Sequence, residues 1–238
     1  AWIERALPVD VASPAVGADA RDDGDGWVVV SEEPDALAAA FGPAARAVTV
    51  ADATDGAALT GATHVVFAPT ATRTDFGALR AHEVFGDVRR VAAALASAPG
   101  RTHLTILTRN AQPVADGEPA DPAQAVLWGF ARTLALENPE IFGRVLDVDA
   151  ALPAALVARH VRAELDSSDG EDQVVLRAGR RLLPRLRAAV PPTPLTGLPG
   201  YTTALVVGAT GNVGPDLIVE LSRMGADTIV ALSRSGAD

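Results

Sequence analysis

The stretch VVGATGNVG, residues 206–214, gives the most informative indication of the fold. It follows an apolar run and precedes an amphipathic one, which predicts a turn between a β-strand and an α-helix. Spacing of this kind gives a tight turn at the first glycine, close backbone approach to a pyrophosphate at the second, and close helix packing at the third. The helix N-terminus then offers free N–H groups and a positive dipole end to phosphates. The predicted nucleotide-binding residues of the loop are Gly208, Thr210, Gly211, Asn212, Val213 and Gly214.

A second apolar strand follows the helix and ends at Ser233 and Arg234. These two residues stand about twenty positions after the glycines, where an acidic residue would bind a ribose 2′-hydroxyl. A serine and an arginine suit a 2′-phosphate instead, so the sequence indicates NADPH rather than NADH as the cofactor.

Strands alternate with helices in the chain that precedes the loop, which predicts an α/β fold with a parallel sheet covered on both faces. Predicted strands include residues 27–30, 47–51, 64–69, 103–108 and 144–149, followed by two short strands around a turn at 178–179. The first buried strand runs into SEEPD, residues 31–35, where a cofactor fold needs glycines. Its carboxylates favour a helix N-terminus but repel a pyrophosphate. We therefore predict a Rossmann-like sheet that lacks a cofactor site.

A change in composition marks the boundary between two regions. VPPTPLTGLPG, residues 190–200, holds four prolines and two glycines and predicts a linker. We expect a cofactor-free Rossmann-like domain at 1–189, and at 201–238 one βαβ unit of a second, truncated Rossmann fold.

Composition excludes several classes of function. A net charge of −10 disfavours nucleic acid and anionic membranes as partners. The chain has no cysteine, and all 20 basic residues are arginine, so thiol and lysine chemistry are excluded. The four histidines lack metal-ligand spacing, and Trp128 and Phe130 are predicted to be core residues. With neither a signal-peptide pattern nor a long apolar segment, we expect a soluble, cytoplasmic protein.

Four stretches in order resemble the ketoreductase domain of modular type I polyketide synthases: residues 2–8, 121–149, 171–186 and 204–238. The resemblance implies two Rossmann-type subdomains, of which the first is structural and the second binds NADPH and reduces a β-ketoacyl group on an acyl carrier protein. It implies neighbouring synthase domains and the carrier protein as partners. The glycine motif departs from the family at Val207, Ala209 and Asn212.

Reduction of a ketone in this family needs a tyrosine, a lysine and a serine at family positions, and this chain matches none of them. Its only tyrosine, Tyr201, follows the predicted linker, and it has no lysine. We therefore expect no catalytic residue in this chain, weak or no NADPH binding by the chain alone, and a truncated, redox-inactive scaffold. Two alternatives remain: a portion of an active NADPH-dependent β-ketoacyl reductase whose catalytic residues lie beyond this chain, and a small NADPH-binding or sensing module.

Overall fold

The computed structural model describes residues 2–5, 26–54, 56–70, 77–98, 100–188 and 203–234. The chain forms two compact units, Ala1–Leu186 and Arg187–Asp238, which are described separately. The predicted linker at 190–200 and Tyr201 lie outside the described residues.

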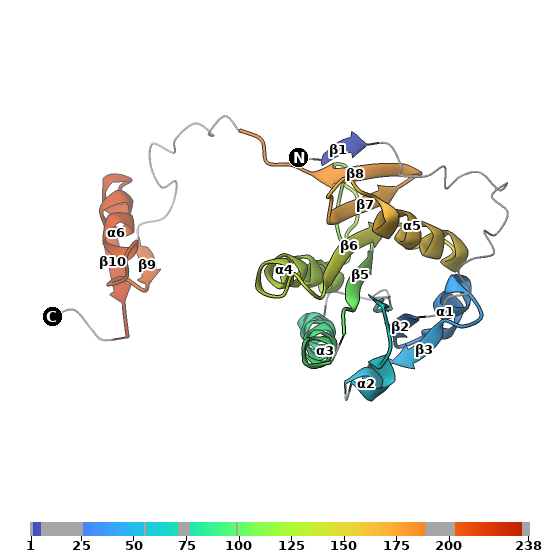
Figure 1. Ribbon diagram of the computed structural model, residues 1–238. Helices are drawn as coiled ribbons and strands as arrows, with labels where there is room; N and C mark the ends of the chain where they lie inside the picture. The colour runs from blue at the N-terminus through green and yellow to red at the C-terminus, as the bar shows by residue number, and fades with distance from the viewer. Residues whose placement is uncertain are drawn as a thin grey trace. The chain divides into compact units, whose positions relative to one another are not determined.

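The first unit is built on one eight-stranded sheet with the order β1-β8-β7-β6-β5-β4-β2-β3 (Figure 1). Its strands are β1 (Trp2–Arg5), β2 (Trp27–Ser31), β3 (Arg46–Thr49), β4 (His64–Phe67), β5 (His103–Arg109), β6 (Phe142–Val148), β7 (Gln173–Arg177) and β8 (Arg180–Pro184). The strands from β2 to β7 pair in parallel, whereas β8 pairs antiparallel with both β7 and β1. The predicted α/β fold is thus confirmed, with an antiparallel pair at one edge.

Helices cover both faces of this sheet. They are α1 (Asp35–Phe41), α2 (Val50–Ala53), α3 (Ala78–Ser97), α4 (Pro122–Glu137) and α5 (Ala154–Asp166), with a short 3₁₀ turn η1 (Ala57–Leu59). The apolar side chains of α2, α3 and α4 join one core cluster, and those of α1 and α5 join a second cluster on the opposite face (Figure 1). Because both faces are covered, Val28, Val29 and Val30 are all completely buried, as their continuous apolar run predicts.

Two local features of the first unit bear on the sequence predictions. The strand predicted at 47–51 is wrong at its end, because Val50 begins α2. Thr49 caps this helix by accepting a hydrogen bond from the N–H of Asp52, which ends the strand. The predicted turn at Ala178 and Gly179 is confirmed, with φ angles of 48° and 74° that suit a two-residue hairpin.

The second unit is one βαβ element, as predicted. It comprises β9 (Thr203–Val207), α6 (Gly214–Arg223) and β10 (Thr228–Leu232), and its two strands pair in parallel. Side chains alternate across a strand, so the two faces of this small sheet differ. Val206 is buried, whereas one face carries exposed apolar side chains: Leu205, Val207, Val230 and Leu232.

None of the helices in the described part of the chain is both long and apolar enough to cross a lipid bilayer.

Candidate nucleotide-binding loop

The loop between β9 and α6 has a backbone that only glycine fits at two positions. Gly208 has a φ of 81°, in the left-handed region that other residues avoid. A Cβ on Gly214 would lie 2.3 Å from the carbonyl oxygen of Ala209, so α6 begins tight against the turn. The loop therefore has the two steric properties that a phosphate-binding turn requires: a sharp reversal after the strand and close packing of the helix start.

Hydrogen bonds bring the two ends of the predicted site together. The N–H groups of Gly208 and Ala209 donate to the carbonyl oxygen of Leu232, at 2.8 and 3.2 Å. Leu232 is the last residue of β10, so Ser233 and Arg234 follow directly beside the glycine turn. Arg234 is exposed and Ser233 is half-buried. All eight predicted cofactor residues therefore belong to one small region, at the carboxyl ends of two parallel strands.

The turn before α6 has backbone N–H groups without a backbone acceptor within residues 203–234. Val213, the residue before the helix, provides no side-chain cap, and Pro215 lies in the first turn. Within residues 203–234, the N–H groups of Thr210, Asn212 and Val213 have no backbone acceptor. Backbone N–H groups in the turn just before a helix suit phosphate oxygens, so the geometry is compatible with the predicted dinucleotide site, whose role in binding stays a prediction. Asp216, which is exposed in the first turn, adds a negative charge at the same place.

At the corresponding edge of the first unit, the unit's own carboxylates occupy hydrogen-bond donors. After β2, the carboxylate of Glu32 accepts a hydrogen bond from the N–H of Thr70 at 2.9 Å and forms an ion pair with Arg80 at 2.5 Å. Burial alone would raise the pKa of the Glu32 carboxyl, but these two donors outweigh it and the pKa lies below its ordinary value. Thus the N–H and the guanidinium that could meet a phosphate here already hold a carboxylate.

A second carboxylate occupies the carboxyl ends of the neighbouring strands. Asp147, completely buried near the end of β6, accepts hydrogen bonds from the N–H groups of Ala111 and Gln112, at 2.8 and 3.0 Å. It also accepts from the hydroxyl of Thr108 at 2.7 Å and pairs with the guanidinium of Arg177. This network fastens the loop that follows β5 across the edge of the sheet, where α/β folds otherwise bind ligands.

Sequence reasoning missed these two carboxylate networks as features of the carboxyl edge. Asp147 stands in the otherwise apolar RVLDVD, and a carboxylate in a buried strand signals a buried partner. Its partner Arg177 lies 30 residues further along the chain, so the pairing itself had no local signal. Trp128 is buried as predicted, whereas Phe130 is only partly buried and lines a groove. The described residues contain no cluster of three or more side chains suited to a metal.

Comparison with known proteins places the chain in a family. Residues 6–186 match the Rossmann fold domain of the polyketide synthase extender module SpnB. The chain is 46% identical over 201 residues to a phenolphthiocerol/phthiocerol polyketide synthase protein of Mycobacterium tuberculosis, which covers 82% of this chain and 12% of that protein. It is 39% identical over 143 residues to erythronolide synthase EryA3 of Saccharopolyspora erythraea, covering 58% of this chain and 4% of that protein.

Solved structures also show similarity to ketoreductases of modular polyketide synthases. A structure of A-type ketoreductases from a modular polyketide synthase superposes with a TM-score of 0.70 at 27% identity, covering 100% of this chain and 52% of that chain. An A1-type ketoreductase gives 0.69 at 27% identity, with the same coverage. The chain therefore belongs to the Rossmann fold domain family of polyketide synthase extender modules, and it is a ketoreductase-like region of a modular polyketide synthase. It spans about half the length of these solved ketoreductases.

Proposed function

We propose that this chain is a structural scaffold within a polyketide synthase ketoreductase, and that it catalyses no reduction by itself. The observation that carries the proposal is the filled carboxyl edge of the first unit, where Glu32 and Asp147 hold the donors that a cofactor phosphate would need. The two regions then have different roles: residues 1–189 form an α/β scaffold without a cofactor, and residues 201–238 form the first part of the cofactor-binding fold.

NADPH is the cofactor that the loop fits. We infer that its phosphates lie over the glycine turn and the start of α6, and that Ser233 and Arg234 hold the 2′-phosphate. When bound, NADPH supplies a hydride. Binding by this chain alone is expected to be weak, because the exposed side chain of Asn212 and the carboxylate of Asp216 stand where the backbone must approach a diphosphate.

Proton transfer is the step for which this chain lacks the tyrosine–lysine pair that the resemblance implies. A developing alkoxide needs a donor such as a tyrosine whose pKa is lowered by a lysine. The 238 residues contain one tyrosine, Tyr201, and no lysine. We propose neighbouring synthase domains and the acyl carrier protein as the partners of the chain, in the cytoplasm, because its relatives are modular polyketide synthases.

The test mixes the purified chain with NADPH and the N-acetylcysteamine thioester of a β-keto acid, and follows NADPH absorbance. We expect no oxidation above the protein-free rate, whereas a complete ketoreductase in the same assay is the positive control. Titration with NADPH, followed by nucleotide fluorescence, is expected to show weak or undetectable binding. Turnover would overturn the scaffold proposal, and micromolar binding without turnover would favour a nucleotide-binding module.

The bare face of the second unit favours a second candidate function. Leu205 and Val207 on β9 are 63% and 73% exposed, and Val230 and Leu232 on β10 are 48% and 53% exposed. Parallel sheets are normally covered on both faces, so further chain that packs here would complete an NADPH-dependent β-ketoacyl reductase. The sequence that follows Asp238 in the synthase decides between the candidates. A serine and a tyrosine with a lysine or asparagine at family spacing, and turnover by the extended protein, would replace the scaffold proposal.

A further inference from the structure

A cluster of charged side chains joins helix α5 to strands β6 and β8 of the first unit (Figure 1). Its members are Arg144 of β6, Glu164 of α5, Arg181 of β8 and Asp169 of the loop after α5. The side chains of Glu164 and Arg181 are each 1% exposed, and that of Arg144 is 10% exposed. Two carboxylates face two guanidinium groups, so these four side chains carry no net charge.

Arg181 makes direct hydrogen bonds to both carboxylates of the cluster. Its Nε and Nη2 donate to the two carboxylate oxygens of Glu164, each at 2.8 Å. Its Nη1 lies 2.8 Å from Oδ2 of Asp169. Burial alone would lower the pKa of Arg181, but these bonds outweigh burial and the pKa lies above its ordinary value.

Arg144 has one nitrogen that the cluster does not bind. Its Nη2 donates to the carbonyl oxygen of Ser167 at 2.9 Å, whereas its Nη1 is buried and has no hydrogen-bond partner among the described residues. Oε2 of Glu164 and Oδ1 of Asp169 both lie 3.9 Å from this Nη1, which is too far for a direct hydrogen bond. Burial accordingly lowers the pKa of Arg144, and the two carboxylates only partly offset that effect.

A second buried polar atom in need of a partner lies beside Arg144. Thr105 of β5 pairs with Arg144 of β6 in the register of the sheet. Leu104 and Ile106 belong to one core cluster and Leu107 to the other, so Thr105 faces the side that α5 covers, as Arg144 does. Its hydroxyl is buried and also lacks a hydrogen-bond partner among the described residues. Polar groups that need a partner thus gather on one face of β5 and β6.

The distances around Nη1 of Arg144 suit a bridging water molecule. A buried donor without an acceptor is costly, and a polar contact longer than 3.5 Å indicates a water between the two groups. An internal water makes about three hydrogen bonds to buried polar groups. A water here would accept from Arg144 and donate one hydrogen to each carboxylate, which makes three bonds. Because the four side chains carry no net charge, a neutral ligand fits better than an ion.

We propose that an internal water molecule binds between β6 and α5, where it accepts a hydrogen bond from Nη1 of Arg144 and donates to Glu164 and Asp169. This water completes a cross-link between helix and sheet. Through Nη2, Arg144 already holds Ser167, the residue that follows α5. Through the water, Arg144 also holds the last turn of α5 and the loop that leads to β7.

The first experiment is a high-resolution crystal structure of the full 238-residue chain, grown with bromide in place of chloride. We expect an ordered water at about 2.9 Å from Nη1 of Arg144. A direct hydrogen bond from Nη1 to either carboxylate would overturn the proposal, and so would the absence of any bound molecule at Nη1. Bromide at Nη1, identified by its anomalous scattering, would show an anion site instead and would also overturn it.

Magnetic relaxation dispersion of water nuclei makes the same test in solution, because it counts internal waters that exchange slowly. Arg144→Met removes the donor, and the dispersion amplitude is expected to fall by the contribution of one water molecule. Arg132→Met is the matched control, since it removes an exposed guanidinium that bonds to Gln173 at 2.9 Å, and it should leave the amplitude unchanged. Equal amplitudes in the wild type and Arg144→Met would overturn the proposal.

Asp169→Ala decides the question if circular dichroism shows that Arg144→Met does not fold. The Asp169 side chain is 39% exposed and forms the outer side of the proposed site, so its removal should let the water exchange faster and lower the dispersion amplitude. Asp149→Ala removes a carboxylate of equal exposure beside Arg177 and should not lower it. An amplitude that Asp169→Ala leaves unchanged, or that both variants lower equally, would contradict the proposed site.

Discussion

The carboxyl edges of the two parallel sheets differ in the residues that come after the strands. In the first unit, Glu32 accepts from the N–H of Thr70, and Asp147 accepts from the N–H groups of Ala111 and Gln112. In the second unit, a glycine turn comes after β9, and within residues 203–234 the N–H groups of Asn212 and Val213 meet no backbone acceptor. At one edge, the closed edge, internal carboxylates occupy the donors, and at the other, the open edge, the glycine turn leaves backbone N–H groups without a backbone acceptor.

On the proposed function, the same kind of sheet serves as a scaffold in one unit and as a binding site in the other, according to the residues just beyond its strands. A carboxylate supplies negative charge and hydrogen-bond acceptors, which are the two things that a phosphate would bring. A glycine supplies neither charge nor acceptor, but without a side chain it lets the backbone come close to a phosphate that supplies both. Substitutions at the closed edge and at the open edge test this difference.

The largest effect is expected from Asp147→Ala at the closed edge. The substitution removes the buried carboxylate that pairs with the Arg177 guanidinium, which keeps its pair with Glu118 at 2.7 Å and the more distant one with Asp149, and it removes the acceptor for two backbone N–H groups. Removing one partner of a buried pair costs about 3–5 kcal/mol of unfolding free energy, and the remaining Glu118 pair places the expected loss at the lower end of that range. Urea denaturation monitored by circular dichroism measures it.

Asp149→Asn is the matched control for Asp147→Ala. Asp149 lies 3.8 Å from the same guanidinium, but its side chain is 39% exposed. An exposed pair contributes about 1 kcal/mol or less, so this variant should remain close to wild type. Equal losses of unfolding free energy in the two variants would contradict the prediction that the buried Asp147 pair stabilises this edge more than the exposed Asp149 pair.

At the open edge, the largest effect is expected from Gly214→Ala. The new Cβ would lie 2.3 Å from the Ala209 carbonyl oxygen, so the turn and the start of α6 must separate. Where the wild-type chain shows measurable NADPH binding by fluorescence titration, we expect the affinity to fall at least tenfold, while the urea unfolding of the first unit stays unchanged. Gly208→Ala meets no atom within 4 Å and strains only its φ of 81°, so a smaller loss is expected. A larger loss at Gly208 would contradict the steric explanation.

The sequence predicted the open edge better than the closed one, for a physical reason. The glycine turn is encoded by a few consecutive residues, and the steric roles of Gly208 and Gly214 follow from local geometry. Their role in cofactor binding stays a prediction. The pairs Glu32–Arg80 and Asp147–Arg177 join residues 48 and 30 positions apart, so only the folded sheet brings them together. Buried strands were predicted well because a continuous apolar run is itself the signal of a sheet covered on both faces.

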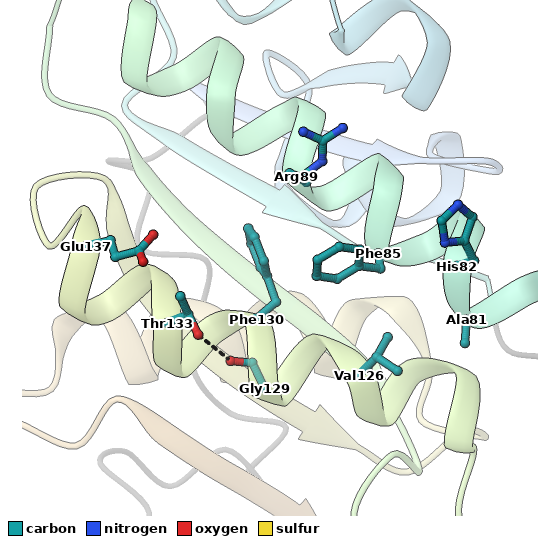
Figure 2. Close-up of a pocket in the computed structure, with 9 residues that line it drawn as sticks. All are labelled: Ala81, His82, Phe85, Arg89, Val126, Gly129, Phe130, Thr133 and Glu137. Atoms are coloured by element: carbon teal, nitrogen blue, oxygen red, sulfur yellow. Dashed lines mark hydrogen bonds between the residues drawn. The ribbon is translucent and has the colours of Figure 1, made fainter. Parts of the chain in front are cut away.

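Two local predictions needed tertiary information. Thr49 begins α2 by capping it, which shortened a strand that its β-branched residues favoured. Phe130 lies on an apolar helix and was assigned to the core; it packs against the core cluster, but it is only partly buried because it also lines a groove (Figure 2). Periodicity shows that a helix is apolar, and packing decides which side faces the core.

A smaller effect is expected at the opposite, amino edge of the first sheet. The His64 ring stacks between Trp27 and His103, with centroid distances of 4.5 and 6.1 Å, and its buried Nδ1 has no hydrogen-bond partner among the described residues. Burial lowers the pKa of His64, and the nearby His103 lowers it further. Below pH of about 6.5, the unfolded chain therefore binds more protons at this position than the folded one.

The sign of the pH effect follows from that lowered pKa. The stability that neutral His64 allows is fully present above pH of about 6.5 and is lost as the pH falls below it. His64→Phe keeps a stacking ring, and the urea midpoint of this variant is expected to decline less between about pH 6.5 and about pH 5 than that of the wild type. The difference in unfolding free energy is expected to be a fraction of the loss caused by Asp147→Ala. Residues 187–238 contain no histidine, so the second unit should lack this response. An unchanged decline in His64→Phe would refute the assignment.

The smallest effect is expected from Asp216→Asn in the first turn of α6. Helical side chains lean toward the N-terminus, so this exposed carboxylate lies near the N–H groups that a diphosphate would use. The Asp216 carboxylate interacts favourably with the helix dipole and repels an anionic ligand. The Glu32 carboxylate has the same two effects in the first unit. Removing the Asp216 charge should tighten NADPH binding about twofold to fivefold at low salt, and less at high salt because exposed charges are screened.

Asp227→Asn makes the same charge change in the exposed loop between α6 and β10, so it controls for net charge. If Asp216→Asn alone tightens NADPH binding, the Asp216 carboxylate competes with phosphate in the second unit. The two units then differ only in how strongly their carboxylates exclude a phosphate. If both variants act equally, only the overall field of the unit matters and the local competition is wrong. If neither the wild type nor Asp216→Asn binds NADPH, the loop is not a cofactor site in this chain, and the contrast between the edges concerns folding alone.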